Sequence, residues 1–199
     1  MRYTNISSSV YKKNRVNFSK KIESFGLAIF NSNDIYPTGA DSTMPFVQHR
    51  DIFYLTGIDQ EETILLLFPE AKNPIYKEIL FIKETNDHIA VWEGEKLSKA
   101  QARNISGIKT ILWVSDFETL FFTLSAQSDL FYFNTNEHYR ANNKTQTRED
   151  RFIEWAKKKY PAHRVAKSNP ILQKLRSIKS SEEIDQIQTA CNITEKGIR

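Results

Sequence analysis

Residues Gln48-His49-Arg50-Asp51-Ile52-Phe53-Tyr54-Leu55-Thr56-Gly57-Ile58 carry the most information about the fold of this 199-residue chain. The centre of the stretch, residues 51–55, is rich in aromatic and branched side chains, which favour extended structure. A continuous apolar run follows at residues 63–68 and ends at Pro69, as in a strand that is covered on both faces. We therefore expect this part of the chain to lie in a buried sheet.

Strands and helices alternate on either side of this stretch. Short apolar runs mark the strands, and apolar residues at helical spacing mark the helices. Strands are predicted at residues 27–30, 79–82, 88–92, 110–114, 130–133 and around 165, and helices at 10–25, 98–105, 116–125, 148–160 and after 169. This alternation predicts an α/β fold, a mixed sheet with helices on both faces.

Two helix starts have recognisable capping residues. Ser115 precedes the helix predicted at 116–125 and has Glu118 three positions later, the spacing of a capping box. Asn169 precedes Pro170, which suits an N-cap followed by proline in the first turn. Residues 31–44 and 141–147 are dense in polar and turn-forming residues, so we expect loops there.

The end of the chain predicts an amphipathic helix. Ser180 and Glu183 form a further capping box, and Ile184, Ile187, Cys191 and Ile198 continue a helical stripe to the end. An apolar stripe needs a surface to cover it. Two alternatives remain open: the helix packs against this domain, or the natural chain continues. We expect Cys191 to be a buried structural residue, because apolar surroundings raise the pKa of a thiol.

Composition narrows the class of protein. Hydrophobic residues make up 40% and aromatic residues 12%, which is enough for a packed core. The net charge of +4 and two short lysine clusters join no nucleic-acid-reading motif, so we predict no nucleic-acid partner. A single cysteine excludes an internal disulfide and fits a reducing compartment. The sequence shows no signal peptide or membrane-spanning run, so we expect a cytoplasmic protein with no membrane partner.

The sequence contains no pattern typical of a catalytic centre. His49, His88, His138 and His163 are not at metal-ligand spacing, and neither a phosphate-binding loop nor a serine-nucleophile motif is present. We predict neither catalytic residues nor metal ligands in this chain. Trp92, which ends the apolar run 89–92, suits either a core position or a contact for a rigid apolar ligand.

Several segments resemble the N-terminal domain of Xaa-Pro aminopeptidases (aminopeptidase P), relatives of prolidase and creatinase. The resemblance runs from about Phe18 to the end of the chain and rests on Asn31-Ser32-Asn33-Asp34, Pro45-Phe46-Val47-Gln48, Asp51-Ile52-Phe53-Tyr54-Leu55-Thr56-Gly57, Ala90-Val91-Trp92-Glu93-Gly94 and Leu175-Arg176-Ser177-Ile178-Lys179-Ser180-Ser181-Glu182-Glu183-Ile184. Val47 and His49-Arg50 depart from the family pattern. The resemblance therefore implies the fold of this segment but not the detailed contacts of its loop.

The resemblance implies a six-stranded mixed sheet flanked by helices, a ribonuclease H-like layer architecture. It implies an N-terminal domain at residues 1–175. Residues 176–199 are then a linker and the first helix of a truncated "pita-bread" catalytic domain, in which two Asp, one His and two Glu hold two metal ions, usually manganese. All five ligand segments are expected beyond Arg199. Trp92 matches a family Trp that lines the proline pocket of a neighbouring subunit, so substrate binding is expected there.

The expected function is thus that of a non-catalytic domain that shapes the substrate pocket and helps to build a homodimer or homotetramer. The full-length enzyme would remove the residue that precedes proline from a peptide. Prolidase, which cleaves dipeptides, is a closely related alternative. A non-catalytic peptide- or protein-binding module is an alternative from another class.

Overall fold

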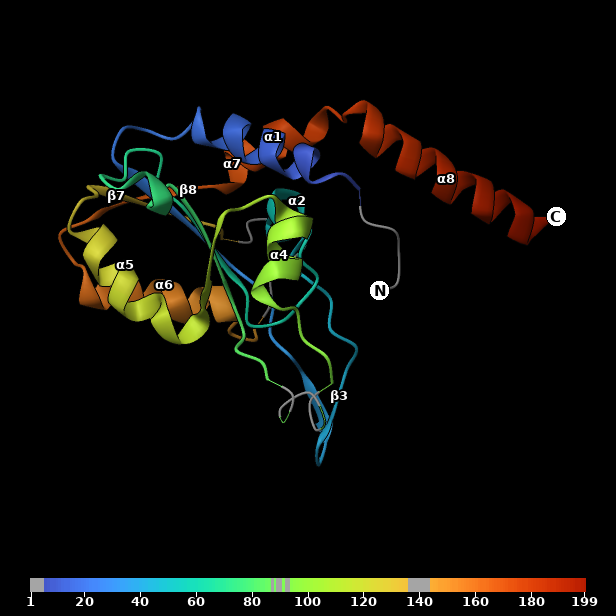
Figure 1. Ribbon diagram of the computed structural model, residues 1–199, viewed down its shortest axis with the longest axis horizontal. Helices are drawn as coiled ribbons and strands as arrows, with labels where there is room; N and C mark the ends of the chain where they lie inside the picture. Colours follow the sequence, from blue (N-terminus) through green and yellow to red (C-terminus); the bar gives the residue numbers. More distant parts are fainter. Residues whose placement is uncertain (1–5, 87, 89–90, 92–93, 136–143) are drawn as a thin grey trace.

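A computed structural model describes residues 6–86, 88, 91, 94–135 and 144–199. Its central element is a mixed sheet that lies between helices (Figure 1). The sheet has six strands in the order β6-β5-β4-β1-β7-β8. β1 is antiparallel to β4 and parallel to β7. The strands are β1 (Gly26–Asn31), β4 (Ile64–Leu67), β5 (Glu78–Ile82), β6 (Thr110–Trp113), β7 (Leu130–Phe133) and β8 (Arg164–Lys167). The predicted α/β class and six-stranded mixed sheet are confirmed.

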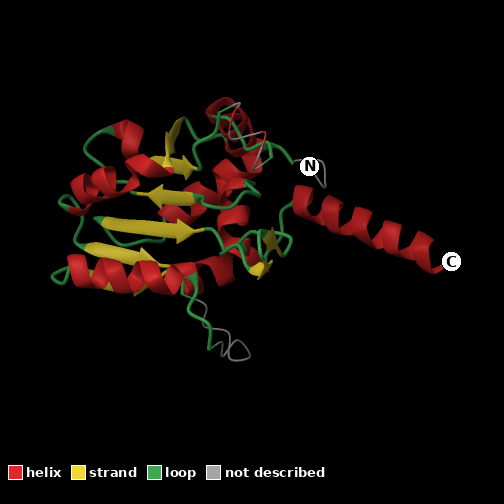
Figure 2. Cartoon of the chain, turned by 90° about the horizontal axis from the view of Figure 1, so that it is seen from below, coloured by secondary structure: helices red, strands yellow, loops and turns green. Residues whose placement is uncertain are grey.

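Helices cover both faces of the sheet (Figure 2). One face packs against α1 (Ser8–Ser19), α2 (Arg50–Thr56), α4 (Lys99–Ser106) and α7 (Asn169–Ser177), and the other against α5 (Phe117–Ser125) and α6 (Arg148–Lys159). Alternate residues of β1 enter opposite layers: Ala28 and Phe30 face the first group, Leu27 and Ile29 the second. Burial of the larger side chains among these, Leu27, Ile29 and Phe30, contributes about 2 kcal/mol of hydrophobic stabilisation each.

The expectation of extended structure at residues 51–55 was wrong, because this segment forms α2. His49 is the N-cap, and its side chain accepts a hydrogen bond from the backbone N–H of Asp51. Gly57 ends the helix with a φ of +69°. Ile52 and Leu55 are fully buried on the side of α2 that faces the sheet. Helical caps and this i,i+3 burial outweigh the weak β-propensity of the aromatic residues.

Two predicted caps differ from the structure. A 3₁₀ turn (Val114–Asp116) precedes α5, and neither Ser115 nor Asp116 caps it through a side chain. Asn169 is the first residue of α7, and Ser168 occupies the N-cap position one residue earlier. The first helix is shorter than predicted and ends at Ser19. The capping box of Ser180 and Glu183 is confirmed.

The segment predicted as a loop at residues 31–44 includes a small hairpin of β2 (Pro37–Gly39) and β3 (Ser42–Thr43), which projects from the domain (Figure 1). The strand predicted at 88–92 falls mostly outside the described residues. Only His88 and Val91 of it are described, and both are helical. Trp92 lies outside the described residues.

The last helix, α8 (Ser181–Ile198), extends away from the layered domain (Figures 1 and 2). None of its residues is buried, and its apolar side chains Ile184, Ile187 and Ile198 are exposed by 54%, 51% and 82%. The prediction that Cys191 is buried was wrong for this chain, because the stripe on which it lies faces solvent. Only the first turns of α8 border the domain, at Glu183, Gln186 and Ile187.

Candidate functional site

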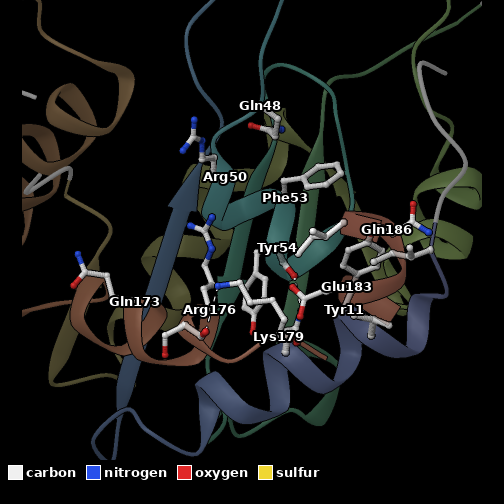
Figure 3. A pocket seen from close by; sticks show the side chains of 15 residues that line it. Tyr11, Gln48, Arg50, Phe53, Tyr54, Gln173, Arg176, Lys179, Glu183 and Gln186 are labelled. Atoms are coloured by element: carbon white, nitrogen blue, oxygen red, sulfur yellow. Dashed lines mark hydrogen bonds between the residues drawn. The ribbon is translucent and has the colours of Figure 1, made fainter. Parts of the chain in front are cut away.

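A cleft of about 740 Å³ lies where α1, α2, α7 and the start of α8 meet. Aromatic and aliphatic side chains contribute most of its surface, among them Tyr11, Phe53, Tyr54 and Ile187. Polar and charged side chains surround them (Figure 3): Gln48, Arg50, Gln173, Arg176, Lys179, Glu183 and Gln186. The cleft thus joins the two segments with the strongest motif content, residues 48–58 and 175–184.

Gln48 fixes the loop that leads into α2. Its side-chain amide donates to the carbonyl oxygens of Ile58, at 3.2 Å, and Gln60, at 2.8 Å. Its carbonyl oxygen accepts a hydrogen bond from the backbone N–H of His49 at 2.8 Å. One buried side chain therefore ties the residues before α2 to those after it. Burial lowers the pKa of His49, so its ring is suited to the neutral, hydrogen-bond-accepting form that caps α2.

An ion pair connects α2 with the last turn of α7. Arg176 Nη1 lies 2.5 Å from Asp51 Oδ1, and the side chain of Asp51 is only 8% exposed. The other carboxylate oxygen of Asp51 accepts a hydrogen bond from Asn134 Nδ2 at 3.1 Å. The guanidinium carbon of Arg176 is also 5.9 Å from the ring centre of Tyr54. Because both oxygens of Asp51 have partners, the carboxylate has a defined orientation.

The α8 side of the cleft begins at a complete capping box. Glu183 accepts from the backbone N–H of Ser180 at 2.9 Å, while Ser180 Oγ accepts from the backbone N–H of Glu183. Burial raises the pKa of Tyr54, and the carboxylate of Glu183 raises it further. The phenol of Tyr54 therefore stays neutral at physiological pH, and it belongs to the wall of the cleft rather than to acid–base chemistry.

A second polar cluster lies where β1 and β7 end. Glu149, in the first turn of α6, accepts from Asn31 Nδ2 at 2.8 Å and from the backbone N–H of Asn134 at 3.2 Å. Burial raises the pKa of Glu149 to about 7. Asn134 therefore links Glu149 to Asp51. Asn31, Asp51 and Asn134 are buried as well, so this cluster is part of the interior of the domain.

These residues are suited to binding rather than to catalysis. Arginine, lysine, glutamine and tyrosine side chains present donors and apolar faces, but they form no nucleophile–base pair. Across the described ranges, no three His, Cys, Asp or Glu side chains gather in a way that could hold a metal ion. No helix in the described part of the chain is long and apolar enough to cross a membrane.

The predicted site residue, Trp92, cannot be placed relative to the cleft, because it lies outside the described residues. Sequence reasoning found both motif segments but missed their contact through Asp51 and Arg176. It also missed the burial of Glu149, because an acidic residue in a first helical turn is usually a solvated partner of the helix dipole. For Asp51, the only indication in the sequence was its place, as an acidic residue, within the motif segment 48–58.

Comparisons with known proteins agree on one family. Residues 11–132 match the model described as "Aminopeptidase P, N-terminal domain". Human Xaa-Pro aminopeptidase 3 is 25% identical over 167 residues, which are 83% of this chain and 32% of that protein. Intermediate cleaving peptidase 55 of Schizosaccharomyces pombe is 22% identical over 98% of this chain and 40% of its own length. The chain spans less than half the length of these curated relatives.

Solved structures support the same fold. A Bacillus anthracis structure assigned as an aminopeptidase P superimposes with a TM-score of 0.87 at 25% identity, covering 97% of this chain and 46% of that one. The Asp260Ala variant of Escherichia coli aminopeptidase P has a TM-score of 0.76 at 20% identity, covering 94% of this chain and 42% of that one. At that identity the second likeness concerns the fold alone.

Proposed function

The chain belongs to the family of aminopeptidase P N-terminal domains, and we propose that it is the non-catalytic domain of a metal-dependent Xaa-Pro aminopeptidase. The enzyme would remove the N-terminal residue that precedes proline from a peptide. The observation that carries this proposal is the family match over residues 11–132. The names of relatives such as Xaa-Pro aminopeptidase from Escherichia coli support the substrate class.

The exposed stripe of α8 supports a division of the protein into two domains. Residues 1–175 would form the N-terminal domain, and residues 176–199 a linker and the first helix of a catalytic domain. Four isoleucines of α8 are at least half exposed, and such a stripe is costly in water unless another surface covers it. The catalytic domain of the same polypeptide would supply that surface, against α8 and the cleft.

The described residues do not fit the metal ions of the proposed reaction. The described residues offer no cluster of three His, Cys, Asp or Glu side chains. The proposal assigns the expected pair of manganese ions to the catalytic domain. The role of this chain would be to shape the entrance to the site, with Trp92 as its substrate-binding residue, and to build a homodimer or homotetramer.

Two alternatives predict different continuations of the protein. A prolidase would carry the same metal ligands and cleave only dipeptides. A non-catalytic binding module would lack the ligands and retain a peptide- or protein-binding surface. We favour the aminopeptidase, because relatives named Xaa-Pro aminopeptidase match most of this chain. A cytoplasmic location is part of the proposal and rests on the single cysteine.

The decisive experiment is to sequence the parent reading frame and to assay its product. A continuation at least as long as this chain, with two Asp, one His and two Glu in family order, supports the proposal. The proposal is further supported if the product releases the first residue from a tripeptide with proline in second position and if this release depends on manganese. Activity on dipeptides alone supports prolidase. A product that lacks the ligands, or that has the 23.2 kDa mass of this chain alone, contradicts both enzymes.

A further inference from the structure

The direction of α8 is determined where α7 ends. Residues 178–180 connect the two helices, and the first of them, Ile178, is extended and 81% exposed. α8 itself has no buried residue that could hold it against the domain. The last turn of α7 is therefore the part of the packed domain nearest to α8, and its position limits the directions that α8 can take.

The last turn of α7 has one strong tie to the domain. Leu172 is buried earlier in the helix and holds its first half in the core. One turn further on, Leu175 is only partly buried. The ion pair of Arg176 with Asp51 follows at 2.5 Å and is the last charged contact before the connection to α8.

Asp51 is a rigid anchor for this tie. It lies in the first turn of α2, where the helix dipole favours a carboxylate. Its second oxygen is held by Asn134, whose own backbone N–H donates to Glu149. The carboxylate therefore cannot rotate to follow Arg176 without losing a buried hydrogen bond. A charge-assisted contact between two oriented groups defines an angle as well as a distance.

We infer that Asp51 and Arg176 are positioning residues: their ion pair sets the direction of α8 relative to the sheet domain. Tyr54 and Glu183 support the arrangement (Figure 3): the ring of Tyr54 lies beside Arg176, and Glu183, in the first turn of α8, lines the same cleft. Loss of the pair leaves the last turn of α7 with only its partly buried apolar contacts, so α8 samples a wider range of directions.

The inference has a functional consequence that rests on the proposed function. If α8 is the first helix of the catalytic domain, the ion pair determines the orientation of that domain relative to the substrate-binding residues of this chain. Weakening the pair should then raise KM for Xaa-Pro peptides more than it lowers kcat, because the metal site stays intact. The direction of α8 can be measured on this chain without any catalysis, so the two proposals fail separately.

The test uses the native Cys191, the only cysteine of the chain, which is exposed on α8. A second label is placed on α5 by Thr119→Cys, at an exposed position far in sequence from the ion pair. Both cysteines carry nitroxides, and pulsed electron paramagnetic resonance measures the distribution of distances between them. The variants are Arg176→Gln and Asp51→Asn, with Arg176→Lys as the conservative rescue.

The matched control is Arg164→Gln, which breaks the exposed pair of Arg164 with Glu23 at 3.3 Å. We expect one narrow distance peak in the parent, in Arg164→Gln and in Arg176→Lys, and a shifted or broadened peak in Arg176→Gln and Asp51→Asn. Circular dichroism checks that each variant is folded. If Asp51→Asn does not fold, Arg176→Gln alone tests the inference. An unchanged peak in Arg176→Gln, or a broad distribution already in the parent, would overturn the inference.

Discussion

The backbone of Gly57 lies directly against the ring of Tyr11. A methyl group at Gly57 would be 2.4 Å from two ring carbons of Tyr11, and the φ of Gly57 is +69°. Glycine is therefore required twice at this position, by the backbone conformation that ends α2 and by the close approach of α1. The contact places Tyr11 at the edge of the cleft.

The first prediction is that Gly57→Ala lowers the free energy of unfolding by more than the cost of placing alanine at a positive φ. The matched control is Gly94→Ala: Gly94 has a φ of +77° but no heavy atom within 4 Å of an added methyl group. We expect a loss of about 1 kcal/mol in the control. The loss in Gly57→Ala should be clearly larger in urea unfolding. Equal losses would show that the ring of Tyr11 moves aside freely.

A buried arginine ties the ends of two helices together. Arg15 is fully buried, and its Nη1 donates to the carbonyl oxygens of Leu55, at 2.8 Å, and Ser106, at 2.9 Å. Leu55 and Ser106 lie in the last turns of α2 and α4, where carbonyl groups lack helical partners. Glu78 supplies the countercharge at 3.1 Å.

We predict that Arg15→Met lowers the free energy of unfolding by about 3 kcal/mol, because two buried carbonyl groups and a carboxylate lose their partner. The control is Lys12→Met on the exposed side of the same helix, which should change it by less than about 0.5 kcal/mol. Chemical unfolding of both variants measures the difference. A loss in Arg15→Met no larger than in the control would mean that apolar packing replaces these hydrogen bonds.

Glu149 makes the stability of the domain depend on pH. Burial raises its pKa from 4.5 to about 7 in the folded state. The folded protein therefore binds more protons than the unfolded chain between these values, and the free energy of unfolding falls as pH rises from 4.5 to 7. The fall amounts to roughly 3 kcal/mol and is complete above pH 7.

Glu149→Gln should flatten this dependence. The comparison of interest is the change in unfolding free energy between pH 5 and 7.5, measured in urea for the variant and for the parent. His49, whose pKa is lowered by burial, acts in the opposite direction, and subtracting the two proteins removes its contribution. Glu154→Gln, at an exposed position of the same helix, serves as control. The same slope in Glu149→Gln and the parent would refute the assignment.

The elements that the sequence predicted correctly are those determined by local apolar patterns. The run at residues 63–68 is a buried strand, and Phe117, Phe121 and Leu124 form the buried face of α5. The segment 51–55 was misassigned because its helix depends on two caps, at His49 and Gly57, and on burial against the sheet. The secondary-structure propensities of residues 51–55 contain no information about these caps or about burial against the sheet.

The candidate site was predictable only in part, because its contacts join distant segments. Asp51 and Arg176 are 125 positions apart, and each belongs to a segment that the sequence had already indicated. Their pairing depends on how α7 crosses α2, which no local pattern encodes. Glu149 is buried because β1 and β7 end beside it, again a property of the assembled sheet.

This chain alone should hydrolyse no Xaa-Pro peptide, even with added manganese. The described residues provide no metal-binding cluster, and the proposed function assigns all five ligands to a separate catalytic domain. The assay follows release of the first residue from a tripeptide with proline second, with the longer gene product as positive control. Turnover that co-purifies with the 199-residue chain and disappears on chelation would contradict the assignment of this chain as non-catalytic.

The role of Trp92 is tested in the longer protein. Because a proline ring is rigid and apolar, an indole face contributes to binding it through contact area rather than through chemistry. We therefore expect Trp92→Ala to raise KM for Xaa-Pro peptides with a smaller effect on kcat, and Trp92→Phe to restore much of the loss. Val91→Ala, at a neighbouring side chain that is 77% exposed, controls for a general effect on this segment. The unfolding midpoint should be unchanged in all three variants. Unaltered kinetics in Trp92→Ala would leave Trp92 with a structural role only.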